Sequence, residues 1–183
     1  MNYYGAKDMA ASFRTVRNNT IIIAQEIAEE HYGFRATPET RSVGQTLTHI
    51  ALVSRVQEQI HAIEKRTDLN GFDFPGFIGK LAEEEQIART KAKIIEFLRA
   101  EGDRFAGWLE SVSDDFLAER VKMPEGMTPP SKTRFEMLSA PKEHEMHHRG
   151  QLMLMERMLG MTPHMTRQMQ ERFASMVKQP VKA

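Results

Sequence analysis

Residues 143–152 read Glu143-His144-Glu145-Met146-His147-His148-Arg149-Gly150-Gln151-Leu152 and hold three of the seven histidines of the chain. In a helix, His144 and His148 are about one turn apart, so their side chains point to the same side. Two imidazoles held in this way can bind one metal ion, but a metal site needs three or more protein ligands. The segment therefore predicts part of a metal site, whose other ligands lie elsewhere in the chain.

The helix that carries this segment is predicted to begin at the capping box Thr133-Arg134-Phe135-Glu136 and to end near Leu159, before Gly160. Pro141 lies inside it. Because proline removes one backbone hydrogen bond and clashes with the preceding turn, we expect either a kink or a late start of this helix.

Three further amphipathic helices are predicted from apolar residues that recur every three or four positions. They span residues 9–31, about 42–65 and about 81–112, and the second opens with the capping box Ser42-Val43-Gly44-Gln45. We expect the acidic run Glu83-Glu84-Glu85 to complement the positive end of the third helix. Strand-like alternation is lacking in the sequence. The pattern therefore predicts an all-α protein, a four-helix bundle spanning residues 1–160.

The remaining segments are predicted to be irregular or peripheral. Residues 67–80 contain three glycines, one proline and three phenylalanines, which predicts a long loop. Residues 113–131 are rich in proline and are expected to form a crossover with a short turn or hairpin. Residues 161–183 open with Thr162-Pro163 and are predicted to form a short C-terminal extra helix that packs on the bundle or on a dimer partner.

A third metal ligand is predicted in the second helix, where His49 lies on the apolar face. A lone histidine on such a face is more often a hydrogen-bonded core residue. Buried imidazoles without partners are costly, however, whereas three that bind one ion are satisfied. We therefore predict that His49, His144 and His148 bind a divalent metal. Nitrogen ligands without thiolates suit Zn, Ni, Fe or Mn, and three ligands leave positions open for water or substrate.

The same segment also fits the metallopeptidase pattern H-E-x-x-H, in which Glu145 would be the general base. That use requires a further ligand downstream and a strand that binds extended peptide, and the sequence offers neither convincingly. A peptidase is thus the third hypothesis, and Glu145 is kept as a candidate catalytic base. His147 is expected on a different face of the helix, outside the metal site.

Composition argues against several classes of protein. The 25 basic and 25 acidic residues are interspersed, which speaks against a nucleic-acid partner. The longest apolar run, residues 20–24, is far shorter than the about 18 to 20 residues of a membrane span. Cysteine is absent, which excludes disulfides and thiolate ligands. The N-terminus does not resemble a secretion signal, so a cytoplasmic location is expected.

Two motifs together carry a family resemblance: Ser42-Val43-Gly44-Gln45-Thr46-Leu47-Thr48-His49-Ile50 and His144-Glu145-Met146-His147-His148-Arg149-Gly150-Gln151-Leu152. They resemble the DinB-like (DinB/YfiT) superfamily of metal-dependent proteins, over about residues 5–160. The resemblance implies a bundle of up-down-down-up connectivity, a homodimer, and a divalent metal held by three histidines, which correspond to His49, His144 and His148. Pro141 and the tail beyond Met161 depart from the family pattern.

The resemblance also narrows the function. Characterised relatives include S-transferases and isomerases that use low-molecular-weight thiols such as bacillithiol or mycothiol. It therefore implies a metal-dependent enzyme with a small-molecule substrate, either a thiol-dependent S-transferase or a hydrolase, with a low-molecular-weight thiol as a candidate cosubstrate. The alternative is a non-catalytic metal-binding protein with a stress-response or interaction role.

Overall fold

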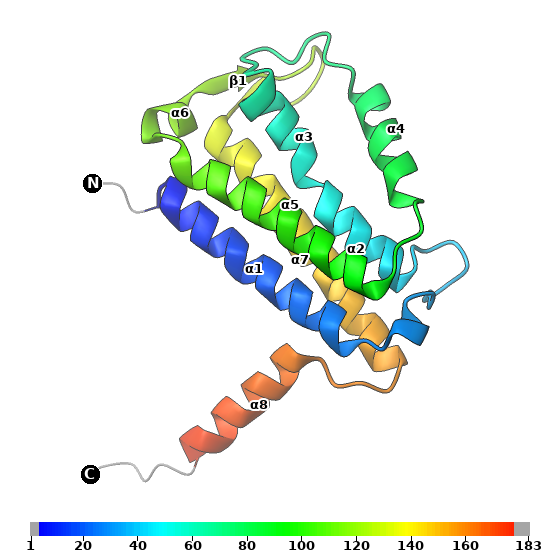
Figure 1. Ribbon diagram of the computed structural model, residues 1–183. Coiled ribbons are helices and arrows are strands. Elements are labelled where there is room, and N and C mark those ends of the chain that lie inside the picture. Colours follow the sequence, from blue (N-terminus) through cyan, green and yellow to red (C-terminus); the bar gives the residue numbers. More distant parts are fainter. Residues whose placement is uncertain (1–3, 178–183) are drawn as a thin grey trace, which may run out of the picture.

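The computed structural model describes residues 4–177 (Figure 1). Most of these residues are helical, and two strands of three residues each pair as an antiparallel hairpin. The elements are α1 (Ala6–Glu26), the 3-10 turn η1 (Glu29–His31), α2 (Val43–Leu52), α3 (Ser54–Glu58), the π-helical turn η2 (Gln59–Ile63), α4 (Phe74–Glu85), α5 (Lys91–Ser111), α6 (Asp114–Ala118), β1 (Arg120–Lys122), β2 (Ser131–Thr133), α7 (Arg134–Met158) and α8 (His164–Val177).

Four long helical segments form a bundle: α1, the continuous path α2–α3–η2, α5 and α7. In Figure 1, α1 and α7 run in one direction, while α2–α3 and α5 run in the other. The chain achieves this because α4 returns along the outside of the bundle, so that α5 starts at the same end as α2. The predicted four-helix bundle of up-down-down-up connectivity is thus confirmed, as is the extra helix, α8.

Several predicted helix boundaries are confirmed by their caps. Ser42 and Gln45 form the expected capping box, with Gln45 N donating to Ser42 Oγ at 3.2 Å. Thr133 accepts from Glu136 N at 3.1 Å, and α7 begins directly after it. The predicted late start of this helix is therefore wrong, and Pro141 lies within α7.

The first helix, predicted to reach residue 31, ends at Glu26, because Ile27 and Ala28 have extended backbone. The hairpin expected within residues 113–131 is formed by β1 and β2, which places its second strand slightly later in the chain. Within residues 4–177, no helix combines the length and the apolar character that a membrane crossing requires.

The long loop predicted for residues 67–80 is wrong in its second half. Phe74 begins α4, because Asp73 caps the helix by accepting from Gly76 N at 2.9 Å and Pro75 occupies the first turn. The glycines in this stretch obscure a helix start that the Asp-x-Pro sequence favours.

The third predicted helix, about residues 81–112, is in fact two helices. α4 ends at Glu85, and α5 starts at Lys91 with Thr90 as its N-cap. The acidic run Glu83-Glu84-Glu85 therefore lies at the C-terminal end of a helix, where a negative charge is not favoured by the helix dipole. The expectation that this run complements the positive end of a helix is therefore wrong, and the three glutamates need another explanation.

A buried ion pair lies in the middle of the bundle. Arg17 on α1 is 3% exposed, and its Nε donates to both carboxylate oxygens of Glu145 on α7, at 3.0 Å each. Its Nη1 donates to the carbonyl of Leu98 on α5 at 2.7 Å, and its Nη2 to that of Ile50 on α2 at 3.2 Å. One side chain thus joins all four bundle helices.

The arginine needs a glycine beside it. A Cβ atom at Gly102 on α5 would lie 2.9 Å from Arg17 Cγ and 3.0 Å from its Nη1. Apolar clusters fill the bundle on both sides of this contact: Phe13 belongs to one cluster and Ile21 to the other.

Replacing Arg17 by methionine leaves the Glu145 carboxylate buried without its partner. We expect a loss of about 3–5 kcal/mol in the free energy of unfolding, measured by urea denaturation. The double variant R17M/E145Q is expected to recover part of this loss, because neither member of the pair is then charged. The control, Arg14→Met, breaks an exposed ion pair with Glu110 and should cost at most about 1 kcal/mol. Equal losses for R17M and R14M would contradict this account.

The junction of α7 and α8 contains a second buried acid. Glu156 is fully buried, and neither of its carboxylate oxygens has a hydrogen-bond partner in the described part of the chain. Burial, together with the nearby charge of Glu26, raises the pKa of Glu156 to about 7. His164, the first residue of α8, is 3% exposed and pairs with Asn19 on α1 at 3.2 Å.

The raised pKa of Glu156 predicts a pH-dependent stability. The folded protein binds a proton at Glu156 more tightly than the unfolded chain does, so this stabilisation is complete below about pH 4 and is lost as the pH rises through about 7. Glu156→Gln should therefore raise the free energy of unfolding by about 1–3 kcal/mol at pH 8 and have little effect at pH 4. Urea denaturation at both pH values tests this, with the exposed Glu143→Gln as control. A gain that does not depend on pH would contradict it.

Candidate metal centre

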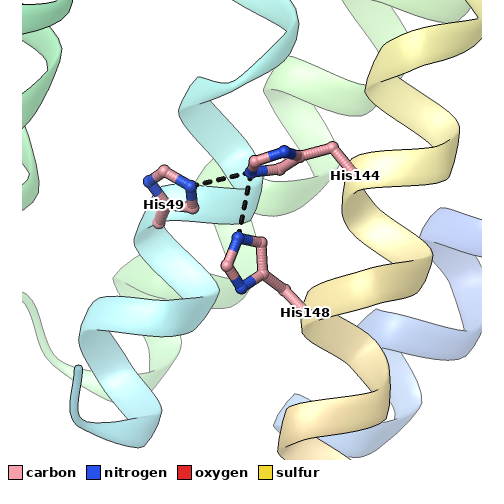
Figure 2. A group of neighbouring side chains, drawn as sticks. All are labelled: His49, His144 and His148. Atoms are coloured by element: carbon pink, nitrogen blue, oxygen red, sulfur yellow. Dashed lines mark hydrogen bonds between the residues drawn. The ribbon is translucent and has the colours of Figure 1, made fainter. Parts of the chain in front are cut away.

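Three histidines from two helices meet at one point between α2 and α7 (Figure 2). The Nε2 atom of His144 lies 2.9 Å from Nε2 of His49 and 2.9 Å from Nε2 of His148. The three possible ligand atoms lie within 4.8 Å of one another. The structure therefore brings together the three residues that the sequence identified as candidate metal ligands.

The central ion pair places these histidines. Arg17 is bonded to the carbonyl of Ile50, next to His49, and to the side chain of Glu145, next to His144. The spacing between α2 and α7 is thus fixed one residue from His49 on α2 and one residue from His144 on α7. His148 lies on the same side of α7 as His144 because the two are four residues apart in the helix.

The outer ring nitrogens of two histidines have partners that define their tautomers. His49 Nδ1 lies 3.0 Å from Oε2 of Glu85, and a carboxylate can only accept, so Nδ1 carries the proton. His148 Nδ1 lies 2.8 Å from Oε1 of Gln151, whose amide nitrogen is turned to His147 at 3.2 Å. In their neutral forms, His49 and His148 therefore both direct an Nε2 lone pair toward His144. Partners of this kind commonly orient metal-binding histidines.

The electrostatic environment keeps the rings neutral. Burial, and then the proximity of His148 and His49, lowers the pKa of His144 to about 4. Burial is also the main cause that lowers the pKa of His49, followed by the charge of Arg41, and burial lowers the pKa of His148. Neutral imidazole is the form that binds metals. Converging lone pairs repel one another, and a cation between them removes this repulsion.

The donor set fits a divalent ion. Nitrogen ligands about 2.0–2.1 Å from a tetrahedral ion lie about 3.3 Å apart. Two of the three separations are 2.9 Å and the third is within 4.8 Å, so ring rotations that lengthen the short pairs and close the third would bring all three nitrogens onto one ion. A cavity of about 770 Å³ opens beside the triad and is lined by His148, Gln151, Arg41 and Glu85, among other residues. The cluster can therefore hold a metal with one side open to small molecules.

The candidate base, Glu145, is not part of this cluster. Its carboxylate is fully buried and both oxygens accept from Nε of Arg17, so it is paired with α1 and has no access to solvent. His147 is exposed and is not one of the three clustered histidines, although its ring centroid lies 4.9 Å from that of His148. His61 is buried, and its Nδ1 lies 2.7 Å from Nη1 of Arg134. That histidine has a structural role.

Sequence reasoning missed three polar residues around the site: Glu85, Gln151 and Arg41. Glu85 is buried at the end of α4, where its Oε1 also accepts from Arg41 Nε at 2.6 Å. This contact accounts for Glu85, and Glu84 pairs with Arg55 and Arg89. Gln151 could have been found from its position three residues after His148, on the same side of the helix. Arg41 carries no comparable signal in the sequence.

The fold and the cluster define a class: four-helix bundles with a tri-histidine site between two helices. The family model for the DinB family matches residues 1–179, and the chain belongs to the DinB family. No curated protein sequence is significantly similar to it.

Two solved structures from Bacillus subtilis share the fold. A DinB-like protein is 19% identical, with a TM-score of 0.60 over 84% of this chain and 93% of that one. The YfiT protein, described as a probable metal-dependent hydrolase with an unusual four-helix bundle topology, is 13% identical, with a TM-score of 0.66 over 86% of this chain and 89% of that one. At such identities the likeness establishes the fold alone.

Proposed function

We propose that this protein is a metal-dependent enzyme that holds one divalent ion with His49, His144 and His148 and acts on a small molecule. The observation that carries the proposal is the convergence of three Nε2 atoms, two of them set as lone-pair donors by Glu85 and Gln151. The description of the distantly similar YfiT protein as a probable metal-dependent hydrolase agrees with it. Zn, Ni, Fe and Mn all suit nitrogen ligands of this kind.

A divalent ion held by the three histidines would supply Lewis acidity, which lowers the pKa of a water or a thiol and so provides a nucleophile near neutral pH. With water as the nucleophile the protein would be a hydrolase, and with a low-molecular-weight thiol it would be an S-transferase. In either reaction Glu85 keeps His49 in the metal-binding tautomer, Gln151 does the same for His148, and the cavity admits the substrate.

Two alternatives are less well supported. Structural zinc sites are usually closed by four protein ligands, whereas the cluster found within residues 4–177 has three and borders a cavity. This favours catalysis over a purely structural or interaction role. An H-E-x-x-H peptidase would need Glu145 as a free base, but Glu145 is buried against Arg17, and the third histidine lies upstream of the motif.

Metal analysis of single variants tests the site. His49→Ala, His144→Ala and His148→Ala should each weaken Zn binding by more than the about 10–100-fold that loss of a ligand's hydrogen-bond partner costs. Glu85→Ala should fall within that range, because it removes only such a partner. Competition with a chelating dye gives the affinities.

The matched control is His31→Ala, which removes a half-buried histidine with no hydrogen bond or ring contact to the triad in the described part of the chain, and it should leave the Zn affinity unchanged. Stoichiometric metal in all three triad variants, or equal weakening by the His31 variant, would show that the ion is not held by the triad.

We also propose that the protein is a homodimer, assembled through α8. The first turn of α8 packs on the bundle through His164, but the rest projects away from it (Figure 1). Met169, Phe173 and Met176 lie on one face of α8 and are 59%, 61% and 66% exposed. Such an apolar stripe is costly in water, and a second copy of the chain brings an identical stripe.

Phe173→Glu should convert a dimer into a monomer with the bundle intact, because it places a charge at the centre of the stripe. Light scattering after size-exclusion chromatography measures the mass, and circular dichroism verifies the fold. Gln168→Glu, on the polar side of α8, is the control and should remain dimeric. A monomeric wild type, or a dimeric F173E, would refute an α8 interface. Residues 178–183, the end of the predicted tail, lie outside the described residues.

A further inference from the structure

The cavity beside the triad contains a guanidinium with unused donors. Arg41 directly precedes Ser42, the N-cap of α2, and lines the cavity. Its Nε donates to Glu85, while its Nη nitrogens have no hydrogen-bond partner among residues 4–177. The side chain is 44% exposed. The N–H groups on Nη1 and Nη2 of Arg41 are therefore available to a molecule in the cavity.

Arg41 lies close to two of the three histidines. It lines the cavity together with His148, and its partner Glu85 also contacts Nδ1 of His49 at 3.0 Å. A molecule that binds Arg41 in this cavity is therefore next to the triad.

The charged residues that line the cavity balance in number, since Arg35 and Arg41 are matched by Glu39 and Glu85. Both oxygens of Glu85 are engaged, Oε1 by Arg41 and Oε2 by His49, whereas the Nη groups of Arg41 still have N–H donors to offer. An anionic group in the cavity can therefore accept from Arg41, and a divalent ion at the triad would add positive charge nearby.

We propose that the cavity binds a substrate that carries a negatively charged group, such as a carboxylate, and that Arg41 binds this group while the reacting end of the substrate lies at the three histidines. The inference rests on the proposed metal-dependent function. Leu154, Met155 and Ala36 line the same cavity and provide an apolar wall for the carbon skeleton between the two ends.

The geometry favours strong binding of such a group. Arginine matches carboxylates with two parallel N–H···O hydrogen bonds, and bonds between charged groups are about twice as strong as neutral ones. Because Nε of Arg41 is already held by Glu85, the guanidinium loses little freedom when a ligand binds. Arg41 is therefore a substrate-binding residue, and Glu85 links it to the metal ligand His49.

Cobalt-substituted protein provides the test, because a thiol that binds Co(II) changes its absorption spectrum. The probes are mercaptoacetate, mercaptopropionate and mercaptobutyrate, each compared with its neutral amide. We expect the wild type to bind at least one acid about tenfold more tightly than its amide, the difference that one charge-assisted contact can supply. In Arg41→Gln this preference should fall below about twofold while the affinity for the amides stays the same.

Arg14→Gln is the matched control, since Arg14 is an arginine of similar exposure with a glutamate partner, and it should keep the wild-type preference. Equal affinity for acids and amides in the wild type would overturn the anion site while leaving the metal centre in place. Equal weakening of acids and amides in R41Q would overturn it too, by showing that Arg41 acts on the metal through Glu85. Failure of the wild type to take up cobalt would overturn both the metal centre and this inference.

Discussion

The contact between Arg17 and Glu145 is the constraint on which the rest of the molecule depends. A charged pair in the middle of a bundle is expensive to bury, and it is tolerated here because each polar group is satisfied. Arg17 reaches an atom on every other bundle helix, so the helices cannot slide relative to one another without breaking at least one of these hydrogen bonds. Leucines and isoleucines alone would allow several registers of similar energy.

This constraint explains why a metal centre can form between two helices that are far apart in sequence. Arg17 is hydrogen-bonded to Ile50 and to Glu145. Ile50 directly follows His49, and Glu145 directly follows His144. A shift of α7 by one residue would turn His144 and His148 away by about 100°, since helical side chains advance by that angle per residue. The polar centre therefore determines the register, and the register determines the site.

Much of this architecture could be predicted from the sequence, and the exceptions have a common cause. The helical repeat and the capping boxes at Ser42 and Thr133 are local patterns, and they predicted the bundle. His49, His144 and His148 could be grouped because imidazoles on apolar faces need partners. Glu145 was interpreted through a motif, and only the fold reveals that Arg17, 128 residues away, takes both of its oxygens.

The same limitation applied to α4. Its sequence is rich in glycine and most of its residues stay exposed or half-exposed, so no buried stripe marks it as a helix. Its buried residue, Glu85, gains its meaning from His49 and Arg41, which lie 36 and 44 residues away. Polar contacts between residues this far apart produce no periodic pattern in the sequence.

The division of the triad between two distant segments affects how the protein folds. His49 and His144 are 95 residues apart, so of the three ligands an unfolded chain keeps only His144 and His148 near each other. An ion that requires all three ligands would bind after the bundle has assembled, and it would bind the native state in preference to the unfolded one. The free energy of unfolding would then increase with the concentration of metal, because the ion binds only the folded protein. The ion would not be required for the bundle to form.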